Sequence, residues 1–497
     1  MSNQVSILKR ASPLMAARLA IAFLNFGIPI VLARVLLREQ YGTFNQGWLL
    51  ANTLYLVLPL GLSPSLSYFT PREPAKKIYW RSHAVLLTTL VGGLAALIMM
   101  TLGKVVADWF HNPELHRLMP YVAAFTFFKI AGATYDGAFM AEGRIKESAL
   151  ARITTEGLYS FCVVGFALYY RSLDGIFMGC VLSTFIRACA CWIRSIKSGF
   201  AISVPDLKRQ LAYALPFAAS FALVIPQQQF HTYLVGATVT AAVFAVYKVG
   251  CLQLPIIDLL YTPVSEILQL GIAEHDAHND NAGALRLFKE AVAKMSFVFV
   301  PTMALLAIVA PQLIQFFYTD KYVEAVPLFR VAMISIPMAA LPLDGVMRAR
   351  AQKRFLFKVS VTKLVLTVPF VWIGLHQFGL MGALGGWIAA EETCRLILLH
   401  RTAKLFHTTI LGALPKELWF QAVAAGIAVI PGALAMHYAR GPLLAQLFEC
   451  GIVFALTYLA SLRVMGVLPP VKSWIPRRKP AVEVAAAAIA GPEVQAA

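Results

Sequence analysis

The chain has 497 residues, of which 59% are hydrophobic and only 14% are charged, and its mean hydropathy is +0.69. A soluble domain has about 25% charged residues, so the composition excludes a soluble enzyme and predicts a membrane protein. The net charge of +18 could suggest nucleic acid as a partner, but the placement of the charges, described below, explains it without one. The seven cysteines lie mostly in apolar runs and lack metal-site spacing, so we expect neither disulfides nor a metal site.

Apolar stretches long enough to cross a membrane recur along the chain. A membrane helix needs about 20 mostly apolar residues, so the pattern predicts an all-α, polytopic protein with about fourteen transmembrane helices. The first apolar run lacks a cleavage site after it, and we expect it to be a retained helix. The predicted spans are 12–37, 43–68, 83–107, 117–141, 149–170, 174–196, 211–235, 239–270, 291–317, 325–347, 357–376, 380–400, 417–437 and 442–465.

Basic residues alternate from one loop to the next. One set of loops holds most of the lysines and arginines, including both ends of the chain. By the positive-inside rule these loops and both termini are predicted to be cytoplasmic, in a bacterial inner membrane. The positive charge is then a topology signal and a contact for anionic lipid. The alternate loops hold only Arg38, Lys104, Arg117, Arg171, Lys321 and Arg440.

Two segments outside the spans have their own composition. In the connection 273–294, the spacing of Leu285, Phe288 and Val292 predicts an amphipathic helix at the membrane interface. The tail 466–497 is rich in proline and alanine and is predicted to be disordered.

The stretches 18–68 and 233–270 have a similar construction, which suggests an internal repeat. In each, a polar or small-residue hinge leads into an apolar helix with prolines, at Pro59 and Pro64 or at Pro255 and Pro263. Proline bends a membrane helix and frees backbone carbonyls, so 239–270 is expected to be tilted or broken. Internal duplication with a site between the halves is a common transporter design.

Short motifs in these stretches resemble the polysaccharide-repeat-unit (O-antigen-type) flippases of the multidrug/oligosaccharidyl-lipid/polysaccharide exporter superfamily. The resemblance covers most of residues 10–400, and it departs from the common form at Phe244, where many members have glycine. The positions that carry it are Leu32, Ala33, Arg34, Leu36, Tyr41 and Gly42, followed by LGLSPSLSYF at 60–69, FAVYKVGCLQLP at 244–255 and VAPQLIQFFYTDKYVEAVPLFRV at 309–331.

The resemblance implies two six-helix lobes around a central cavity, with two additional C-terminal helices here. It implies alternating access and a lipid-linked oligosaccharide cargo on undecaprenyl pyrophosphate, moved from the cytoplasmic to the periplasmic leaflet. Polysaccharide polymerase and chain-length proteins are possible partners, and the chain is expected to be a monomer without a cofactor, coupled to H⁺ or Na⁺. The expected units are an N-terminal lobe at 1–196, a cytoplasmic linker at 197–210, a C-terminal lobe at 211–400, the additional helices at 417–465 and the tail at 466–497.

Cations within the spans are the first candidates for a site, because a pyrophosphate needs compensating charge in the membrane. Charged residues in spans usually face a cavity or pair with each other. Lys129 could instead form an ion pair with Asp136 or with another helix, and Lys363 is expected to reach the membrane interface. The candidate cavity cations are Arg18, Lys129, Arg187 and Lys248.

Acidic and amide side chains complete the candidate site. Four acids could pair with these cations or carry the coupling ion: Asp136, Asp258, Glu266 and Asp344. Gln227, Gln228 and Gln229 could hydrogen-bond sugar hydroxyls, or could join helices to each other. Glu391 is expected to pair locally with Arg395.

No catalytic motif stands out, and we expect no enzyme activity. One alternative is a cation-coupled multidrug antiporter of the same superfamily, which would favour acidic residues in its cavity. A polytopic glycan polymerase or ligase is a second alternative, but it would normally need a large outward loop. No predicted outward loop exceeds about a dozen residues.

Overall fold

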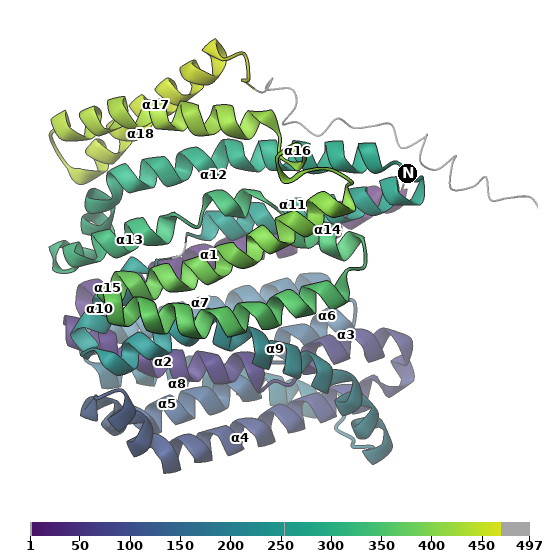
Figure 1. Cartoon of the computed structure of the whole chain (residues 1–497). Helices are drawn as coiled ribbons and strands as arrows, with labels where there is room; N and C mark the ends of the chain where they lie inside the picture. Colours follow the sequence, from purple (N-terminus) through teal and green to yellow (C-terminus); the bar gives the residue numbers. More distant parts are fainter. Residues whose placement is uncertain (1, 253, 469–497) are drawn as a thin grey trace, which may run out of the picture.

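The computed structural model describes residues 2–252 and 254–468, apart from the side chains of residues 2–18 and Ile256, and these residues form helices without a strand (Figure 1). The first lobe contains α1 (Ser2–Val35), α2 (Arg38–Val57), α3 (Leu62–Arg72), η1 (Pro74–Lys76), α4 (Lys77–Trp109), α5 (Pro113–Ala131), α6 (Tyr135–Ala141), α7 (Ile145–Tyr170) and α8 (Leu173–Lys197). The second contains α9 (Val204–Thr238), α10 (Ala241–Gly250), α11 (Pro255–Ala277), α12 (Asn281–Tyr318), η2 (Asp320–Ala325), α13 (Val326–Met333), η3 (Pro337–Ala340), α14 (Leu343–Ala349), α15 (Lys353–Leu405) and α16 (Ile410–Ala413). The hairpin of α17 (Lys416–Tyr438) and α18 (Leu443–Val464) packs on α12.

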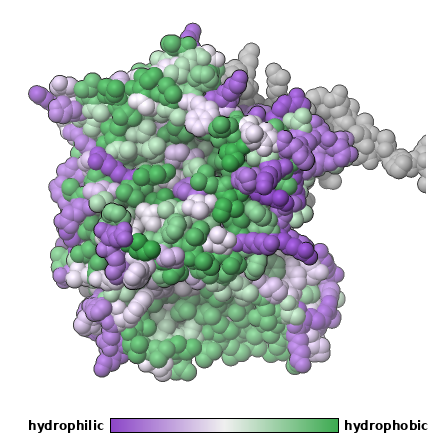
Figure 2. Space-filling view, in the orientation of Figure 1, coloured by the Kyte–Doolittle hydropathy of each residue, from purple (hydrophilic) through white to green (hydrophobic). Residues whose placement is uncertain are grey.

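The outer surface is that of a multi-pass membrane protein. Nine helical stretches of the described chain are long and apolar enough to cross a membrane, and Leu19–Val35 and Ala241–Gly250 are shorter apolar helices. On α4, Leu90, Leu94 and Leu97 share one face, and their side chains are 58–60% exposed. Such an exposed apolar face is favourable when it lies against lipid. Figure 2 shows apolar side chains over a broad central band and polar ones gathered at both edges. The number of fourteen spans remains a prediction.

The second and fourth membrane helices of each lobe are broken. In the first lobe the breaks separate α2 from α3 and α5 from α6, and in the second they separate α10 from α11 and α13 from α14. The first break contains Leu60 and Gly61, both with positive φ, and α11 begins at Pro255, where a proline is tolerated because the first helical amide has no partner in the helix. The stretch 239–270 is therefore broken, and the two lobes repeat the same pattern of breaks.

The expected interfacial helix at 273–294 does not exist as a separate element. α11 continues to Ala277, and α12 begins at Asn281 and runs to Tyr318 as one helix. Phe288 and Val292 are fully buried in a cluster with residues of α11 and α14. That prediction was wrong because the apolar face of this segment is covered by protein rather than lipid.

α15 is a hairpin of two arms. Gly379 has φ +62° and ψ −143°, a conformation open to glycine, and it reverses the chain between the predicted spans 357–376 and 380–400. The arms approach so closely that a Cβ on Gly374 would lie 2.1 Å from the carbonyl oxygen of Gly382. Small residues of this kind let membrane helices pack backbone to backbone.

The two lobes share one large apolar core at one end of the molecule, and at the other end they form two smaller clusters, one mostly of the first lobe and one of the second. We call the end marked N in Figure 1 the N-terminal end, and the end where α1 finishes and α2 starts the opposite end. The largest core lies toward the opposite end and combines residues of both lobes, such as Leu32 and Phe244. Toward the N-terminal end, α3 and α4 form one cluster with Ala214 of α9, and α11, α12, α14 and α15 form another.

Candidate functional site

The closed opposite end is built on the crossing of α2 and α10. A Cβ added to Gly42 would lie 1.8 Å from the carbonyl oxygen of Ala241, so only glycine allows this approach. Beside the crossing, Gln46 donates a hydrogen bond of 3.3 Å to the carbonyl of Gly236. The Tyr41 and Tyr322 rings lie 6.0 Å apart, edge to face. The motif residues Tyr41 and Gly42 therefore hold the lobes together.

Two arginines add the polar links across this end. Arg34 Nε donates a 2.8 Å hydrogen bond to the carbonyl of Phe317, and its Nη2 bonds the carbonyl of Phe316, at the last turn of α12. A cation suits a helix C-terminus, where the carbonyls lack helical partners. Arg38 forms an ion pair of 3.2 Å with Glu324.

Arg34 and Arg38 connect helices of the first lobe to helices of the second that follow α9. Of the hydrogen bonds and ion pairs between described residues, those of Arg34 and Arg38 are the ones that join α1–α8 to α10–α15. α9 is bonded to the first lobe at both ends, and at the N-terminal end it forms the ion pairs Asp206–Lys76 at 2.9 Å and Arg209–Glu73 at 2.8 Å. The lobes are thus locked at one end and tethered at the other.

Lys129 lies within a membrane helix of the first lobe and forms no ion pair with an acidic residue of the described chain. It is half-buried on α5, and its ammonium donates a 3.2 Å hydrogen bond to Oδ1 of Asn52 on α2. Three aromatic rings surround the ammonium, with centroids at 4.7 Å for Tyr55, 5.2 Å for Phe125 and 5.6 Å for Trp48. Aromatic faces attract a cation without neutralising it. The positive charge of Lys129 is therefore held in place but not cancelled.

Arg187 has a different role from Lys129. Its Nη2 pairs with Asp136 at 2.9 Å, its Nη1 lies 3.7 Å from Glu156, and its Nε donates to the Gly132 carbonyl at 3.1 Å. Arg187 thus connects α8 to α6, to α7 and to the break between α5 and α6. The expected ion pair between Lys129 and Asp136 is absent from the described residues, because Asp136 pairs with Arg187 and Lys129 contacts Asn52. Arg187 is fully engaged within the protein.

Lys248 lies in the last turn of the short helix α10 and is half-buried. It makes no hydrogen bond or ion pair with any described residue. It lies seven residues from Ala241, about 10 Å along the helix, and Asn52 lies about 15 Å along α2 from Gly42 at the same crossing. Lys248 and Lys129 thus lie on α10 and α5, two helices that pack against α2. Arg18 belongs to α1, but its side chain lies outside the described residues.

The candidate acids of the second lobe divide into paired and unpaired groups. Asp344 accepts hydrogen bonds from the Tyr261 hydroxyl and from Ser265 at 3.2 Å, and it pairs with Arg348 at 2.6 Å. Asp258 and Glu266 are both exposed on α11, and neither forms an ion pair with a described residue. Asp344 thus joins α11 to α14, while the other two carboxylates remain open to their surroundings.

The three glutamines on α9 point in different directions. Gln227 is buried, and its side chain donates a 2.9 Å hydrogen bond to the Leu223 carbonyl one turn back. Gln228 is exposed and Gln229 is half-buried. Three consecutive helical residues are spread around the helix, so they do not form one polar surface.

Several residues of these clusters escaped prediction. Asn52, Tyr55 and Glu156 reach Lys129 or Arg187 from other helices, and one sequence carries no signal for such long-range pairs. Lys363, which was expected to reach the membrane interface, forms an ion pair with Glu391 across the two arms of α15. The expected pair of Glu391 with Arg395 is present at 3.2 Å.

A family model described as "Polysaccharide biosynthesis protein" matches residues 31–327. The fold is similar to that of the solved structure "Lipid II flippase MurJ, inward closed conformation", with a TM-score of 0.71, 13% identity, and coverage of 92% of this chain and 99% of that chain. It is also similar to an inward-facing multidrug resistance MATE family transporter of the MOP superfamily, with a TM-score of 0.64, 14% identity, and coverage of 79% and 98%. A MOP superfamily transporter from Pyrococcus furiosus has a TM-score of 0.55 at 14% identity, with coverage of 81% and 95%. No curated protein matches the chain. These similarities confirm an all-α membrane fold with two lobes.

Proposed function

The chain belongs to the polysaccharide biosynthesis protein family, as the resemblance in its motifs indicated, and from that premise we propose that it is a flippase for a lipid-linked oligosaccharide. The cargo is an oligosaccharide repeat unit on undecaprenyl pyrophosphate, and it moves from the cytoplasmic to the periplasmic leaflet. The distribution of basic loops supports a cytoplasmic N-terminal end. A closed opposite end then corresponds to an inward-facing state of an alternating-access cycle.

The observation that carries this proposal is the pair of uncompensated cations beside α2. Lys129 is bonded to a neutral amide, and Lys248 has no polar partner among the described residues. A cation in the membrane without a counter-ion is unfavourable, so a bound anion such as a pyrophosphate would stabilise it. The flanking aromatic rings of Trp48 and Tyr55 suit the sugar end of such a cargo as well as the ammonium.

A flipping assay in proteoliposomes tests this function. We expect Lys129→Gln to reduce flipping of a fluorescent pyrophosphate-linked oligosaccharide by roughly ten- to a hundredfold, because one charge-assisted contact is worth about 1.5–3 kcal/mol. Lys129→Arg keeps the charge and should retain most of the activity. Lys104→Gln removes an exposed charge on α4 and serves as the matched control.

Two results would contradict the proposal. Equal flipping by Lys129→Gln and the unmodified chain would remove Lys129 from the site. Transport of a cationic drug, with no movement of the pyrophosphate lipid, would favour the multidrug antiporter. Repeating the assay with an imposed H⁺ or Na⁺ gradient identifies the coupling ion. Asp258 and Glu266, which form no ion pair with a described residue, are our candidates for the carboxylates that bind this ion.

A further inference from the structure

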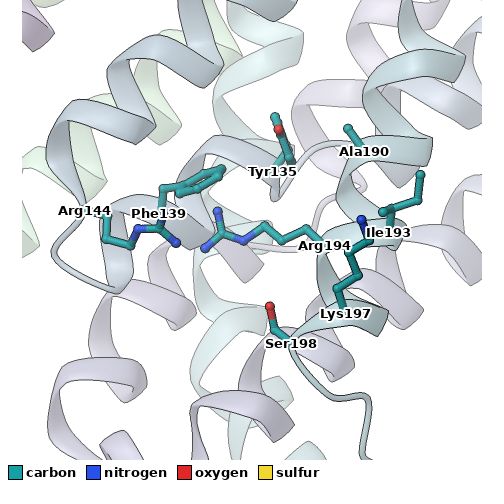
Figure 3. A pocket seen from close by; sticks show the side chains of 8 residues that line it. All are labelled: Tyr135, Phe139, Arg144, Ala190, Ile193, Arg194, Lys197 and Ser198. Carbon is teal, nitrogen blue, oxygen red and sulfur yellow. The ribbon is translucent and has the colours of Figure 1, made fainter.

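A basic pocket lies at the N-terminal end of the first lobe, outside the proposed transport site. Its volume is about 540 Å³, and it lies between α6 and the last two turns of α8. The guanidinium groups of Arg144 and Arg194 both lie against the Phe139 ring, at 5.0 and 3.2 Å from its centroid. Figure 3 shows these two groups reaching toward each other beside the ring, with Lys197 and Ser198 at the rim. The pocket is thus a preformed cluster of donors.

Positive charge is in excess around this pocket. Glu142 pairs with Arg194 at 2.7 Å and also with Arg81 at 3.0 Å. Arg144 lies 3.8 Å from the same Glu142 carboxylate and pairs with Glu147 at 3.1 Å. Lys197 is exposed and has no ion-pair partner in the described chain, and Nη1 of Arg194 is buried without a hydrogen-bond acceptor there. The four cations at this site therefore outnumber its two carboxylates, and one buried donor lacks an acceptor.

The C-terminus of α8 would normally repel an anion, because its last carbonyls carry partial negative charge. Here Arg81 donates to the carbonyls of Ser198 and Gly199, at 3.2 and 3.5 Å. This contact compensates the helix end and leaves the pocket attractive to an anion.

The pocket continues into an apolar face that is directed to lipid. Ile193 lines the pocket and is 52% exposed, and Ile186, two turns along α8, is 40% exposed. Ala190 lies between them on the same helix face and also lines the pocket. A donor cluster at the polar edge, with a strip of exposed apolar side chains leading from it along α8, matches the headgroup and acyl chain of a phospholipid.

We propose that this pocket binds the phosphate headgroup of an anionic phospholipid of the leaflet at the N-terminal end, with an acyl chain along Ala190 and Ile186. Basic pockets between membrane helices on the cytoplasmic side bind anionic headgroups in this way. The bound lipid is a structural partner of the first lobe and is distinct from the transported cargo.

Native mass spectrometry of the full chain, with phosphatidylglycerol or phosphatidylcholine added, tests the proposal. Lys197→Gln should weaken the retained phosphatidylglycerol about fivefold, since one basic residue near an anionic surface contributes about that factor. Ala190→Phe changes no charge but places a bulky ring on the pocket wall and the apolar strip, and it should also reduce retention. Lys208→Gln removes an exposed charge from the same end of the molecule and should leave retention unchanged.

The same experiment separates a lipid from free phosphate. The proposal is supported if phosphatidylglycerol is retained over phosphatidylcholine and inorganic phosphate fails to displace it at millimolar concentration. Inorganic phosphate that binds as tightly as the lipid, equal retention of both lipids, or no effect of both Lys197→Gln and Ala190→Phe would each overturn it. Because Lys197 is exposed and has no ion-pair partner among the described residues, its replacement should leave the fold intact.

Discussion

Arg187 and Lys129 carry the same charge in the same lobe, but their neighbours are of different kinds. Arg187 lies among two carboxylates and a carbonyl, so its charge stabilises the packing of α6, α7 and α8. Lys129 has a neutral amide and three aromatic rings, so its charge remains available to a ligand. A charge within a membrane helix predicts that the residue matters, and the partners of that residue decide whether the charge stabilises packing or remains available to a ligand.

The N-cap residue of α12, Asp280, provides a testable prediction about a single side chain. It caps α12 by accepting a 2.7 Å hydrogen bond from the Gly283 amide, and it also contacts His275 at 3.0 Å. The Gly283 hydrogen bond holds the pKa of Asp280 below its ordinary value of about 3.9, and His275 acts in the same direction. A carboxyl with a lowered pKa stabilises the fold above its ordinary pKa, and this contribution is lost as the pH falls through the lowered value.

We therefore expect Asp280→Ala to lower the melting temperature by about 1–2 °C at neutral pH. The difference from the unmodified chain should shrink as the pH falls below about 3.9. Melting curves from tryptophan fluorescence in detergent measure it. Asp280→Asn keeps an acceptor for the Gly283 amide and does not titrate, so it should stay close to the unmodified chain at neutral pH. A constant difference for Asp280→Ala down to pH 3 would contradict the assignment.

At the scale of elements, breaks and close crossings decide how apolar helices pack. Without water-driven attraction between them, membrane helices associate through close van der Waals contact, which small residues permit. The two arms of α15 use glycine in this way. Gly382 approaches Gly374 closely, whereas Gly385, less than one turn further along the same arm, has nothing within 4 Å of an added Cβ.

This difference predicts opposite effects of one substitution. Gly382→Ala should destabilise the protein by about 1–3 kcal/mol, because the added Cβ would lie 2.0 Å from the Gly374 carbonyl oxygen. Gly385→Ala should be neutral or stabilising by up to about 1 kcal/mol through helix propensity. Chemical or thermal unfolding in detergent compares the two variants. Equal stability of both would show that the arms do not pack as described.

At the scale of the whole molecule, one shared core and two separate cores define the state of the protein. The shared core and the links of Arg34 and Arg38 close the opposite end. The separate cores let each lobe keep its internal packing when that end opens. A packed interface of this kind has discrete arrangements, which suits a rocking motion between two states.

Gly42 tests this description. Gly42→Leu should hold the lobes apart at the opposite end, since its Cβ would overlap the Ala241 carbonyl. The test uses a double variant in which cysteines replace Arg38 and Glu324. A bifunctional thiol reagent should cross-link this double variant, and the yield of cross-linked protein should be roughly tenfold lower when Gly42→Leu is added. Gly27→Leu is the control, because nothing lies within 4 Å of an added Cβ at Gly27. An unchanged yield in Gly42→Leu would rule out the close crossing of α2 and α10.

Composition, apolar run length and loop charge by themselves determined that this protein is a multi-pass bundle of helices, because a continuous apolar run of about 20 residues crosses lipid as a helix, which satisfies its own backbone hydrogen bonds. The motifs around Arg34, Tyr41 and Gly42 indicated the family, but their physical role, the joining of two lobes, became visible only in the fold. The pairing of Arg187 with Asp136 and Glu156, the aromatic surroundings of Lys129 and the basic pocket beside Phe139 were decided by tertiary structure alone. Each joins residues on different helices, and no local pattern states which helices will be neighbours.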